Sequence, residues 1–208
     1  MGSPKCEIII YDGFDDMDAF GVLEALHWAS YSVQVKSVRK QDVITTSAGL
    51  KIIPAGTFNL NTCPDVLIVP GGGWRLGDQR NATEIVGAEL EVEKGELPEL
   101  LRQFHRHAKE SGGVLASVCT GSLILGRTNL LKGRPATTNR QAINQLQEMG
   151  AKLMDVRVAD DGDIITASGI TASLDLGLWL IQRFSGVDAA IAISQQLEFE
   201  MRGPIWHR

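Results

Sequence analysis

Cys119 stands between two segments of different character, which raises the question of whether it is a nucleophile. Residues 113–119 (GVLASVC) form an apolar run typical of a buried strand, and residues 120–131 (TGSLILGRTNLL) have the pattern of a helix. A strand–nucleophile–helix turn lifts a side chain above the sheet, and Gly121 and Ser122 leave the backbone free to turn tightly. The dipole and free N–H groups of the new helix would stabilise a thiolate. A second interpretation stays open, because an unpaired cysteine often simply packs in the core.

Two other features follow strand-like segments. Asp18 comes after the strand predicted at 6–12, on the apolar side of a helical pattern and beyond the residue expected to cap that helix. A carboxyl placed there would be desolvated, so its pKa would rise and it could share a proton with a thiol. The segment 65–73 (DVLIVPGGG) ends in three glycines, whose N–H groups could face a developing negative charge. These features also have plain structural interpretations, as a helix cap and a tight turn.

Short apolar runs alternate with longer helical patterns along the whole chain, and this alternation predicts the fold. It indicates βαβ units and a single doubly wound α/β domain over residues 1–208, with a mainly parallel sheet and helices on both faces. Sites in such sheets form at the carboxyl ends of strands, so Asp18, the glycines and Cys119 are expected to converge. The expected strands are 6–12, 32–39, 65–73, 113–119 and 134–138, with hairpins over 43–56 and 152–168. The expected helices are 15–30, 98–109, 120–131, 139–150, 171–186 and 188–201, and residues 74–97 form a long polar stretch.

Composition narrows the classes of function. The 208 residues carry a formal net charge of −5, which argues against a nucleic-acid-binding protein. No apolar run is long enough to span a membrane, and no secretory signal precedes the first strand. Three widely spaced cysteines fit a reducing, cytoplasmic location better than a disulfide framework. His105 and His107 lie two residues apart on a helix and face different directions, so no metal pair is predicted.

Three segments, together with Asp18, resemble the ThiJ/PfpI superfamily, which has a flavodoxin-like, class-I glutamine-amidotransferase-like fold. They are 69–74 (VPGGGW), 117–138 (SVCTGSLILGRTNLLKGRPATT) and 165–186 (ITASGITASLDLGLWLIQRFSG). Cys-Thr-Gly with an early Asp is similar to the isonitrile hydratase-like subgroup. Peptidase-like members follow the nucleophile with His, whereas this chain has Thr120.

The resemblance implies a set of roles. Cys119 is the nucleophile, Asp18 is the acid that bonds to it, and the N–H groups of Gly72 and Thr120 stabilise an anion. The implied reaction is the addition of water to an isonitrile through a thioimidate on Cys119, giving an N-substituted formamide. The resemblance implies a small-molecule substrate, a homodimer, and neither a metal nor an organic cofactor. The implied substrate pocket also contains Gly73, Gly121 and Asn139, the last of which replaces a His found in many relatives.

Other functions compatible with the same residues stay open. Relatives with a thiol–carboxyl pair perform glyoxalase-like chemistry on dicarbonyls, and the absence of a His next to Cys119 counts against that reading. A non-catalytic redox or ligand sensor would use a low-pKa, exposed Cys119. The polar stretch 74–97 and the tail after residue 196 differ from the hydratase pattern. Regulator relatives carry a DNA-binding domain after this fold. No such domain follows the fold in these 208 residues, so the domain is expected to act alone or through partners.

Overall fold

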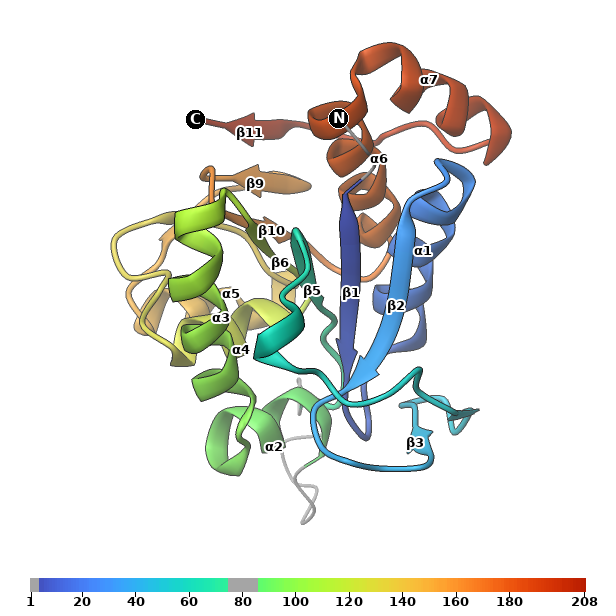
Figure 1. Ribbon diagram of the computed structural model, residues 1–208. Helices are drawn as coiled ribbons and strands as arrows, with labels where there is room; N and C mark the ends of the chain where they lie inside the picture. The colour runs from blue at the N-terminus through green and yellow to red at the C-terminus, as the bar shows by residue number, and fades with distance from the viewer. Residues whose placement is uncertain (1–3, 75–85) are drawn as a thin grey trace.

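Four of the five predicted strands lie in one central sheet in the computed structural model, which describes residues 4–74 and 86–208. The strand order is β11-β9-β10-β6-β5-β1-β2 (Figure 1). Five neighbouring strands run parallel, and β9 runs antiparallel to its neighbour β10. The parallel strands are β1 (Lys5–Ile10), β2 (Ser32–Ser37), β5 (Val66–Val69), β6 (Val114–Val118) and β10 (Ile164–Ala167); β9 (Val158–Asp160) and β11 (Ile205–His207) complete the sheet.

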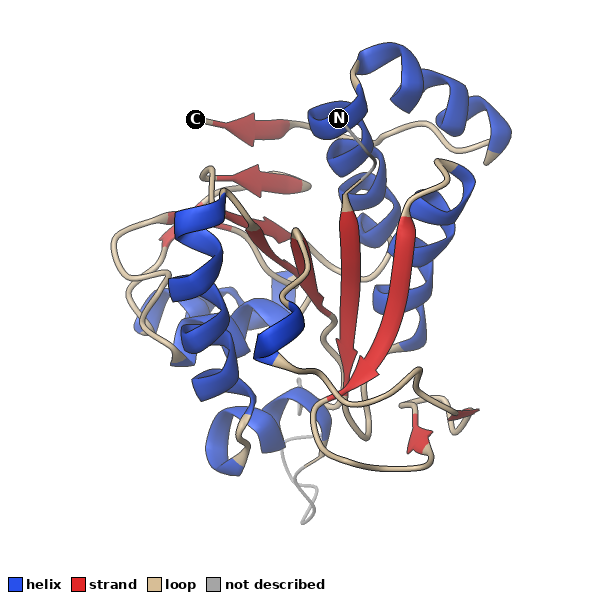
Figure 2. Ribbon diagram, viewed as in Figure 1, coloured by secondary structure: helices blue, strands red, loops and turns tan. Residues whose placement is uncertain are grey.

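Helices cover both faces of this sheet, which confirms the doubly wound α/β fold (Figure 2). One side carries α1 (Asp16–Trp28), α6 (Ala172–Ser185) and α7 (Val187–Gln196). The other side carries α2 (Gly87–Lys94), α3 (Leu97–Ser111) and α4 (Gly121–Arg127), with α5 (Ile143–Glu148) packed against α4. No helix among these described residues is long and apolar enough to cross a membrane.

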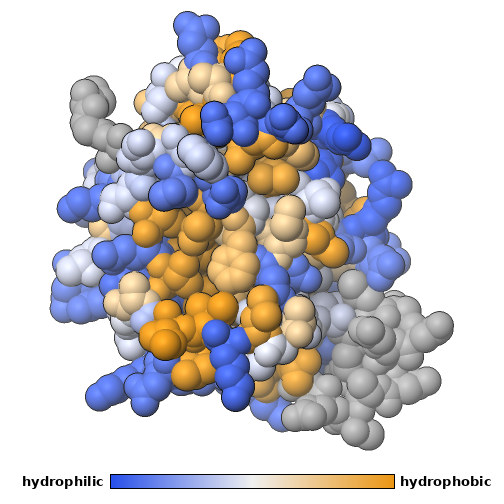
Figure 3. Space-filling model, turned by 90° about the vertical axis from the view of Figure 1, so that its right-hand side faces the viewer, coloured by the Kyte–Doolittle hydropathy of each residue, from blue (hydrophilic) through white to orange (hydrophobic). Residues whose placement is uncertain are grey.

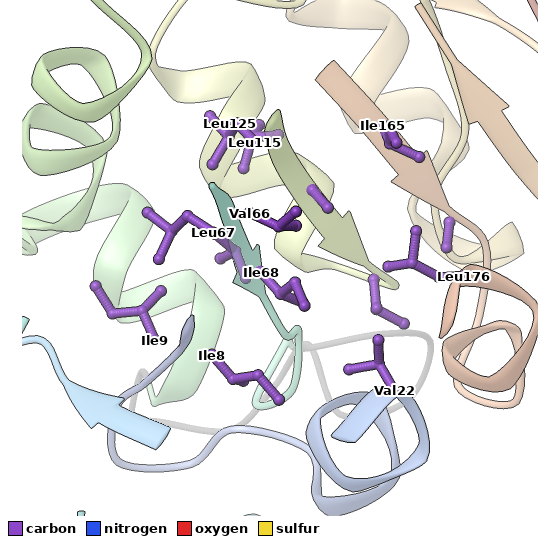
Figure 4. Close-up of a cluster of buried hydrophobic side chains, with 14 of the residues drawn as sticks. Ile8, Ile9, Val22, Val66, Leu67, Ile68, Leu115, Leu125, Ile165 and Leu176 are labelled. Atoms are coloured by element: carbon purple, nitrogen blue, oxygen red, sulfur yellow. The ribbon is translucent and has the colours of Figure 1, made fainter. Parts of the chain in front are cut away.

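The strands are apolar on both faces because each face is covered by helices. Register places Ile8 of β1 beside Ile68 of β5, and Leu67 of β5 beside Leu115 of β6. Alternation along β5 therefore sends Leu67 and Ile68 to opposite faces of the sheet. Figure 4 shows both halves of the resulting core, with α4 on one side and α1 and α6 on the other.

The hairpin predictions are confirmed in part. β3 (Ile44–Thr45) and β4 (Lys51–Ile52) form an antiparallel pair, and β9 and β10 are joined by a turn through residues 161–163. Two predicted strand segments instead pair with each other outside the central sheet. These are β7 (Pro135–Ala136) and β8 (Lys152–Leu153), which run parallel.

Several boundaries differ from the sequence predictions. The helix predicted at 120–131 ends at Arg127, followed by Asn129 with a φ of +66°, and the helix predicted at 139–150 is a 3₁₀ turn followed by the shorter α5. The stretch predicted as polar and irregular contains α2, which is anchored because the buried Glu91 accepts two hydrogen bonds from Arg39; residues 75–85 of that stretch lie outside the described residues. The last helix was predicted to reach residue 201, but it ends at Gln196. Glu198 has a φ of +47° and the Ser194 hydroxyl caps the Phe199 carbonyl, so the chain turns away and continues into β11.

Close packing of α1 against α6 fixes the two sides of the candidate site. A Cβ atom on Gly21 would lie 2.2 Å from the Ser173 hydroxyl oxygen, and one on Gly177 would lie 2.6 Å from the Ala25 Cβ. Only glycine permits this approach. Asp18 lies on α1, and α6 begins directly after the loop that follows β10. The contact between the two helices therefore sets the distance between Asp18 and that loop.

Candidate active site

Cys119 occupies a strained turn between β6 and α4. Its φ is +56°, in the left-handed region that a residue with a Cβ rarely adopts. The turn is held by the Cys119 N–H, which donates to the carbonyls of Ala167 (3.0 Å) and Ser168 (2.9 Å) at the end of β10. A Cβ on Gly121 would lie 2.4 Å from the Val69 carbonyl oxygen, so only glycine lets α4 start this close to β5. The predicted nucleophile turn is present in the geometry.

The Cys119 thiol is almost completely enclosed, with the residue 5 % exposed. Burial raises the pKa of the Cys119 thiol to about 12, and the negative charge of Asp18 acts in the same direction. Three donors oppose this rise in pKa: the Ile170 N–H, the Asn139 side-chain amide and the Thr120 N–H. The expectation that the new helix would leave a low-pKa thiolate is therefore wrong, because desolvation outweighs the donors around the sulfur.

Asp18 lies beside this thiol and is fully buried. One carboxyl oxygen accepts a hydrogen bond of 2.9 Å from the Gly71 N–H, whereas the other is buried with no partner of ordinary geometry. Burial raises the pKa of Asp18 well above its usual value, and the charge of Asp15 adds to the effect. The Gly71 bond and hydrogen bonding with the Cys119 thiol lower this pKa in part. These surroundings favour the protonated form of Asp18, which is the form that could give a proton to a reacting group.

The backbone N–H groups of the glycine loop after β5 bind Asp18 and Thr120, and in this structure they do not form an open anion pocket. Gly71 supplies the N–H that binds Asp18, and the Gly72 N–H donates to the Thr120 hydroxyl at 2.9 Å. The Gly72 N–H is therefore occupied in this structure, contrary to its expected role as an available donor. A Cβ on Gly72 would lie 2.2 Å from the Asp15 nitrogen, and one on Gly73 would lie 2.7 Å from the Gly87 Cα. These two glycines are required by close packing of three loops.

Asn139 also contacts the sulfur of Cys119. Its Nδ2 donates to Cys119 Sγ at 3.3 Å, while its Oδ1 accepts from the Gln141 N–H at 3.0 Å. The second bond fixes the orientation of the amide, so that a donor and not an acceptor faces the sulfur. The neighbouring Thr138 hydroxyl donates to the Cys119 carbonyl at 2.8 Å. Asn139 is thus held as a directed donor to Cys119.

A hollow of about 1170 Å³ lies beside these groups. Four of the residues that line it contact Cys119, namely Thr138, Asn139, Ser168 and Ile170, whereas Cys119 itself is not a lining residue. Segments far apart in the sequence form its walls: residues 137–143, 153–157, 168–171 and 202–204. The hollow is where the rest of a molecule would lie if one of its atoms reached the sulfur.

Two backbone contacts in the site were not foreseen from the sequence, although Gly71 belongs to the glycine segment that was expected to offer N–H donors. Gly71 binds Asp18 through its backbone, and Ile170 donates its N–H toward Cys119 from a strained φ of +37°. Backbone donors leave no mark in residue type. The signal available was position, since both residues follow the carboxyl ends of strands adjacent to β6.

The other sulfur and metal-ligating groups of the described residues form no second site of this kind. Cys6 is buried and its pKa is raised to about 12, chiefly by burial, and the Cys63 thiol donates to the Leu60 carbonyl. Within residues 4–74 and 86–208, no cluster of His, Cys, Asp or Glu has the arrangement needed for a metal ion. The chemistry available in the described part of the chain is that of the Cys119–Asp18 pair.

Comparison with known proteins decides the family. Residues 4–183 match the model of the DJ-1/PfpI family. The chain belongs to the DJ-1/PfpI family. It is 38% identical over 175 residues to an isonitrile hydratase from Pseudomonas putida, a match that covers 83% of this chain and 68% of that protein. It is also 32% identical to the transcriptional regulator GbdR from Pseudomonas aeruginosa, over 85% of this chain but only 42% of the regulator.

Solved structures agree with this membership. A ThiJ/PfpI family protein from Pseudomonas syringae superposes with a TM-score of 0.78 at 30% identity, covering 98% of this chain and 78% of the other. Drosophila melanogaster DJ-1beta has a TM-score of 0.80 at 19% identity, covering 96% of this chain and all of the other, which shows the shared fold. DJ-1/PfpI proteins therefore include a hydratase, DJ-1 proteins and regulators, and the family alone does not fix the activity.

Proposed function

We propose that this DJ-1/PfpI protein is a cysteine-dependent enzyme that hydrates small carbon–nitrogen compounds, with isonitriles as the substrates. The observation that carries the proposal is the pairing of Cys119, on its strained turn, with a buried Asp18 whose pKa is raised. The similarity to the Pseudomonas putida isonitrile hydratase supports the same reaction. Both groups act without a bound cofactor in the steps below.

The first step forms a bond between Cys119 Sγ and the terminal carbon of the isonitrile. Asp18 holds a proton because burial raises its pKa, and it gives this proton to the same carbon as the sulfur attacks. The proton of the thiol replaces the one that Asp18 has lost, so the pair ends the step unchanged in charge. The product is a thioimidate, R–N=CH–S–Cys119.

The second step releases the product. Water attacks the thioimidate carbon, its protons pass to the nitrogen and back to the sulfur, and the C–S bond breaks. The sum is R–NC plus H₂O giving R–NH–CHO, with the Cys119 thiol regenerated. Directed donors around the sulfur, Asn139 and the N–H groups of Thr120 and Ile170, would stabilise negative charge on it as the C–S bond breaks.

An assay with the purified protein tests the proposal. An aromatic isonitrile is supplied, and the N-substituted formamide is followed by chromatography for the wild type, Cys119→Ala and Cys63→Ala. Turnover by the wild type and Cys63→Ala but not by Cys119→Ala is expected. Turnover that survives in Cys119→Ala would refute the role of the thiol. No turnover in any of the three would refute isonitrile hydration and make dicarbonyls, the substrates of glyoxalase-like relatives, the next compounds to assay.

The geometry of Cys119 does not support the alternative function as a redox sensor. A peroxide-sensing cysteine needs an accessible thiolate, but Cys119 is 5 % exposed and its pKa is raised to about 12. The enzyme reading does not require a thiolate before the substrate binds, because Asp18 supplies the proton.

We also propose that the protein acts as a homodimer. Exposed apolar side chains gather on the side that carries α1 and α7, where Figure 3 shows a band of apolar surface. Large exposed apolar patches mark association surfaces. The large exposed apolar residues on these helices and the adjoining end of α6 are Met17, Trp28, Phe184, Val187 and Ile191.

A further inference from the structure

The hollow beside Cys119 is much larger than an isonitrile carbon requires. Its volume of about 1170 Å³ exceeds the roughly 300–1000 Å³ typical of pockets that hold drug-sized ligands. In the proposed reaction, the reacting carbon would occupy only the part next to Asn139 and Ile170. The walls therefore carry information about the remainder of the substrate.

Most of the wall is apolar, and its charged groups are few. The apolar side chains come from α5, β8 and the loop after it, the loop after β10, and the tail before β11: Ile143, Leu153, Met154, Val156, Ile170 and Pro204. Three arginines and one aspartate also line the hollow: Arg140, Arg157, Arg202 and Asp155. The balance of these charges decides what kind of substituent the hollow favours.

Arg157 is already neutralised. Its Nε donates to Asp175 Oδ2 at 2.9 Å, and Asp175 is buried at the start of α6. The other oxygen of Asp175 accepts a hydrogen bond of 2.9 Å from the Arg202 backbone N–H. The backbone N–H of Arg157 donates to the Pro204 carbonyl, also at 2.9 Å. Arg157 and Asp175 thus fix the tail as one wall of the hollow, and Arg157 contributes no free charge.

Arg140 and Arg202 differ from Arg157 in this respect. Both side chains are exposed at the rim, and neither guanidinium has an ion-pair partner within the described ranges. They come from two separate walls, the 3₁₀ turn η3 (Arg140–Ala142) and the tail. Asp155, also exposed, is the single opposing charge. The rim therefore carries a net charge of about +1, on groups whose planar geometry suits carboxylates.

We infer that the substrate of the Cys119 site carries a negatively charged group, such as a carboxylate, on an apolar body, and that Arg140 and Arg202 bind that group. The inference rests on the proposed function for the reacting end of the molecule. The apolar body lies against the aliphatic wall, the reacting carbon meets Cys119, and the anion stays at the exposed rim, where its desolvation cost is low. Arg140 and Arg202 then determine specificity and take no part in bond breaking.

The test compares 4-isocyanobenzoate with 4-methylphenyl isonitrile, which has nearly the same shape but no charge. We expect the wild type to favour the carboxylate in kcat/KM by about tenfold, equivalent to about 1.4 kcal/mol. The double variant Arg140→Gln/Arg202→Gln is expected to bring that ratio close to one. Asp155→Asn is expected to raise the ratio, because it removes the opposing charge. Arg106→Gln, an exposed arginine on α3 away from the hollow, is the matched control and is expected to keep the wild-type ratio.

Two results separate this inference from the proposed function. If both isonitriles are hydrated with a ratio near one that no variant changes, hydration stands and the inference is overturned. If neither is hydrated, binding is measured instead, by mass spectrometry of Cys119 modified with methyl methanethiosulfonate in the presence of benzoate or benzamide. Protection by benzoate that exceeds protection by benzamide, and that disappears in the double variant, supports the inference without any turnover. Equal or absent protection overturns it.

Discussion

Replacing Asp18 by Asn separates the chemical role of this carboxyl from a structural one. The Asn amide oxygen can accept the Gly71 N–H bond that Asp18 accepts at 2.9 Å, and the size of the side chain hardly changes. The variant cannot supply a proton to a reacting carbon. Loss of a positioned general acid lowers a rate by about 10²–10⁴-fold, so isonitrile hydration is expected to fall by that factor.

Stability is expected to move in the opposite direction. Burial raises the pKa of Asp18, so its protonated form is favoured in the folded state while the unfolded chain ionises it near pH 4. The wild type therefore loses stability as pH rises from the unfolded pKa toward the folded pKa. Asn has no such loss. Each unit of pKa difference corresponds to about 1.4 kcal/mol, or about 3–6 °C in Tm for a chain of this size. Asp18→Asn is expected to melt at or above the wild-type temperature at pH 7, with the gap closing near pH 4.

The thiol offers a third measurement. The charge of Asp18 raises the pKa of Cys119, so its removal is expected to lower that pKa and speed alkylation of Cys119 at pH 9. Hydration falls while alkylation rises, and an unchanged or raised Tm separates this result from damage to the fold, which would also expose the buried thiol. Asp188→Asn, an exposed residue in the first turn of α7, is the matched control and should leave hydration and alkylation unchanged. A variant that melts several degrees lower at pH 7 but retains hydration would show that Asp18 is structural and refute the reasoning.

Three further outcomes are expected. Asn139→Ala removes the 3.3 Å donor to Cys119 Sγ, so the pKa of the thiol is expected to rise further. Because a hydrogen bond to a charged group contributes roughly 1.5–3 kcal/mol, alkylation at pH 9 should slow by about 10- to 100-fold. An unchanged rate would contradict this assignment. Gly72→Ala and Gly162→Ala both place a Cβ at positive φ, but only the Cβ at position 72 meets backbone atoms, at 2.2 Å. Urea unfolding should show a loss of about 1–2 kcal/mol in the free energy of unfolding for Gly162→Ala and a clearly larger loss for Gly72→Ala. Light scattering should give twice the chain mass for the wild type and the single mass for Trp28→Glu/Ile191→Glu, whereas a monomeric wild type would rule out the homodimer.

The sequence alone was enough to predict the order of the main elements and the position of the reactive groups. Apolar runs such as 65–69 are continuous because both sheet faces are buried, and that pattern already implies a parallel sheet with helices on each side. The strand-end rule placed Asp18 and Cys119 at one edge because it depends only on chain direction and alternation. Residue types and local periodicity carry this information.

The tertiary structure decided the electrostatics of the site and the wall that faces the substrate. Burial from every direction raises the pKa of Cys119, whereas the sequence around it indicated only a favourable helix start. Gly71 and Ile170 act through backbone N–H groups, which no residue type reveals. The end of α7 and the pairing of the tail as β11 depend on contacts between segments distant in the chain. The sum of desolvation, backbone donors and long-range contacts exists only in the folded molecule, so it could not be predicted from local sequence.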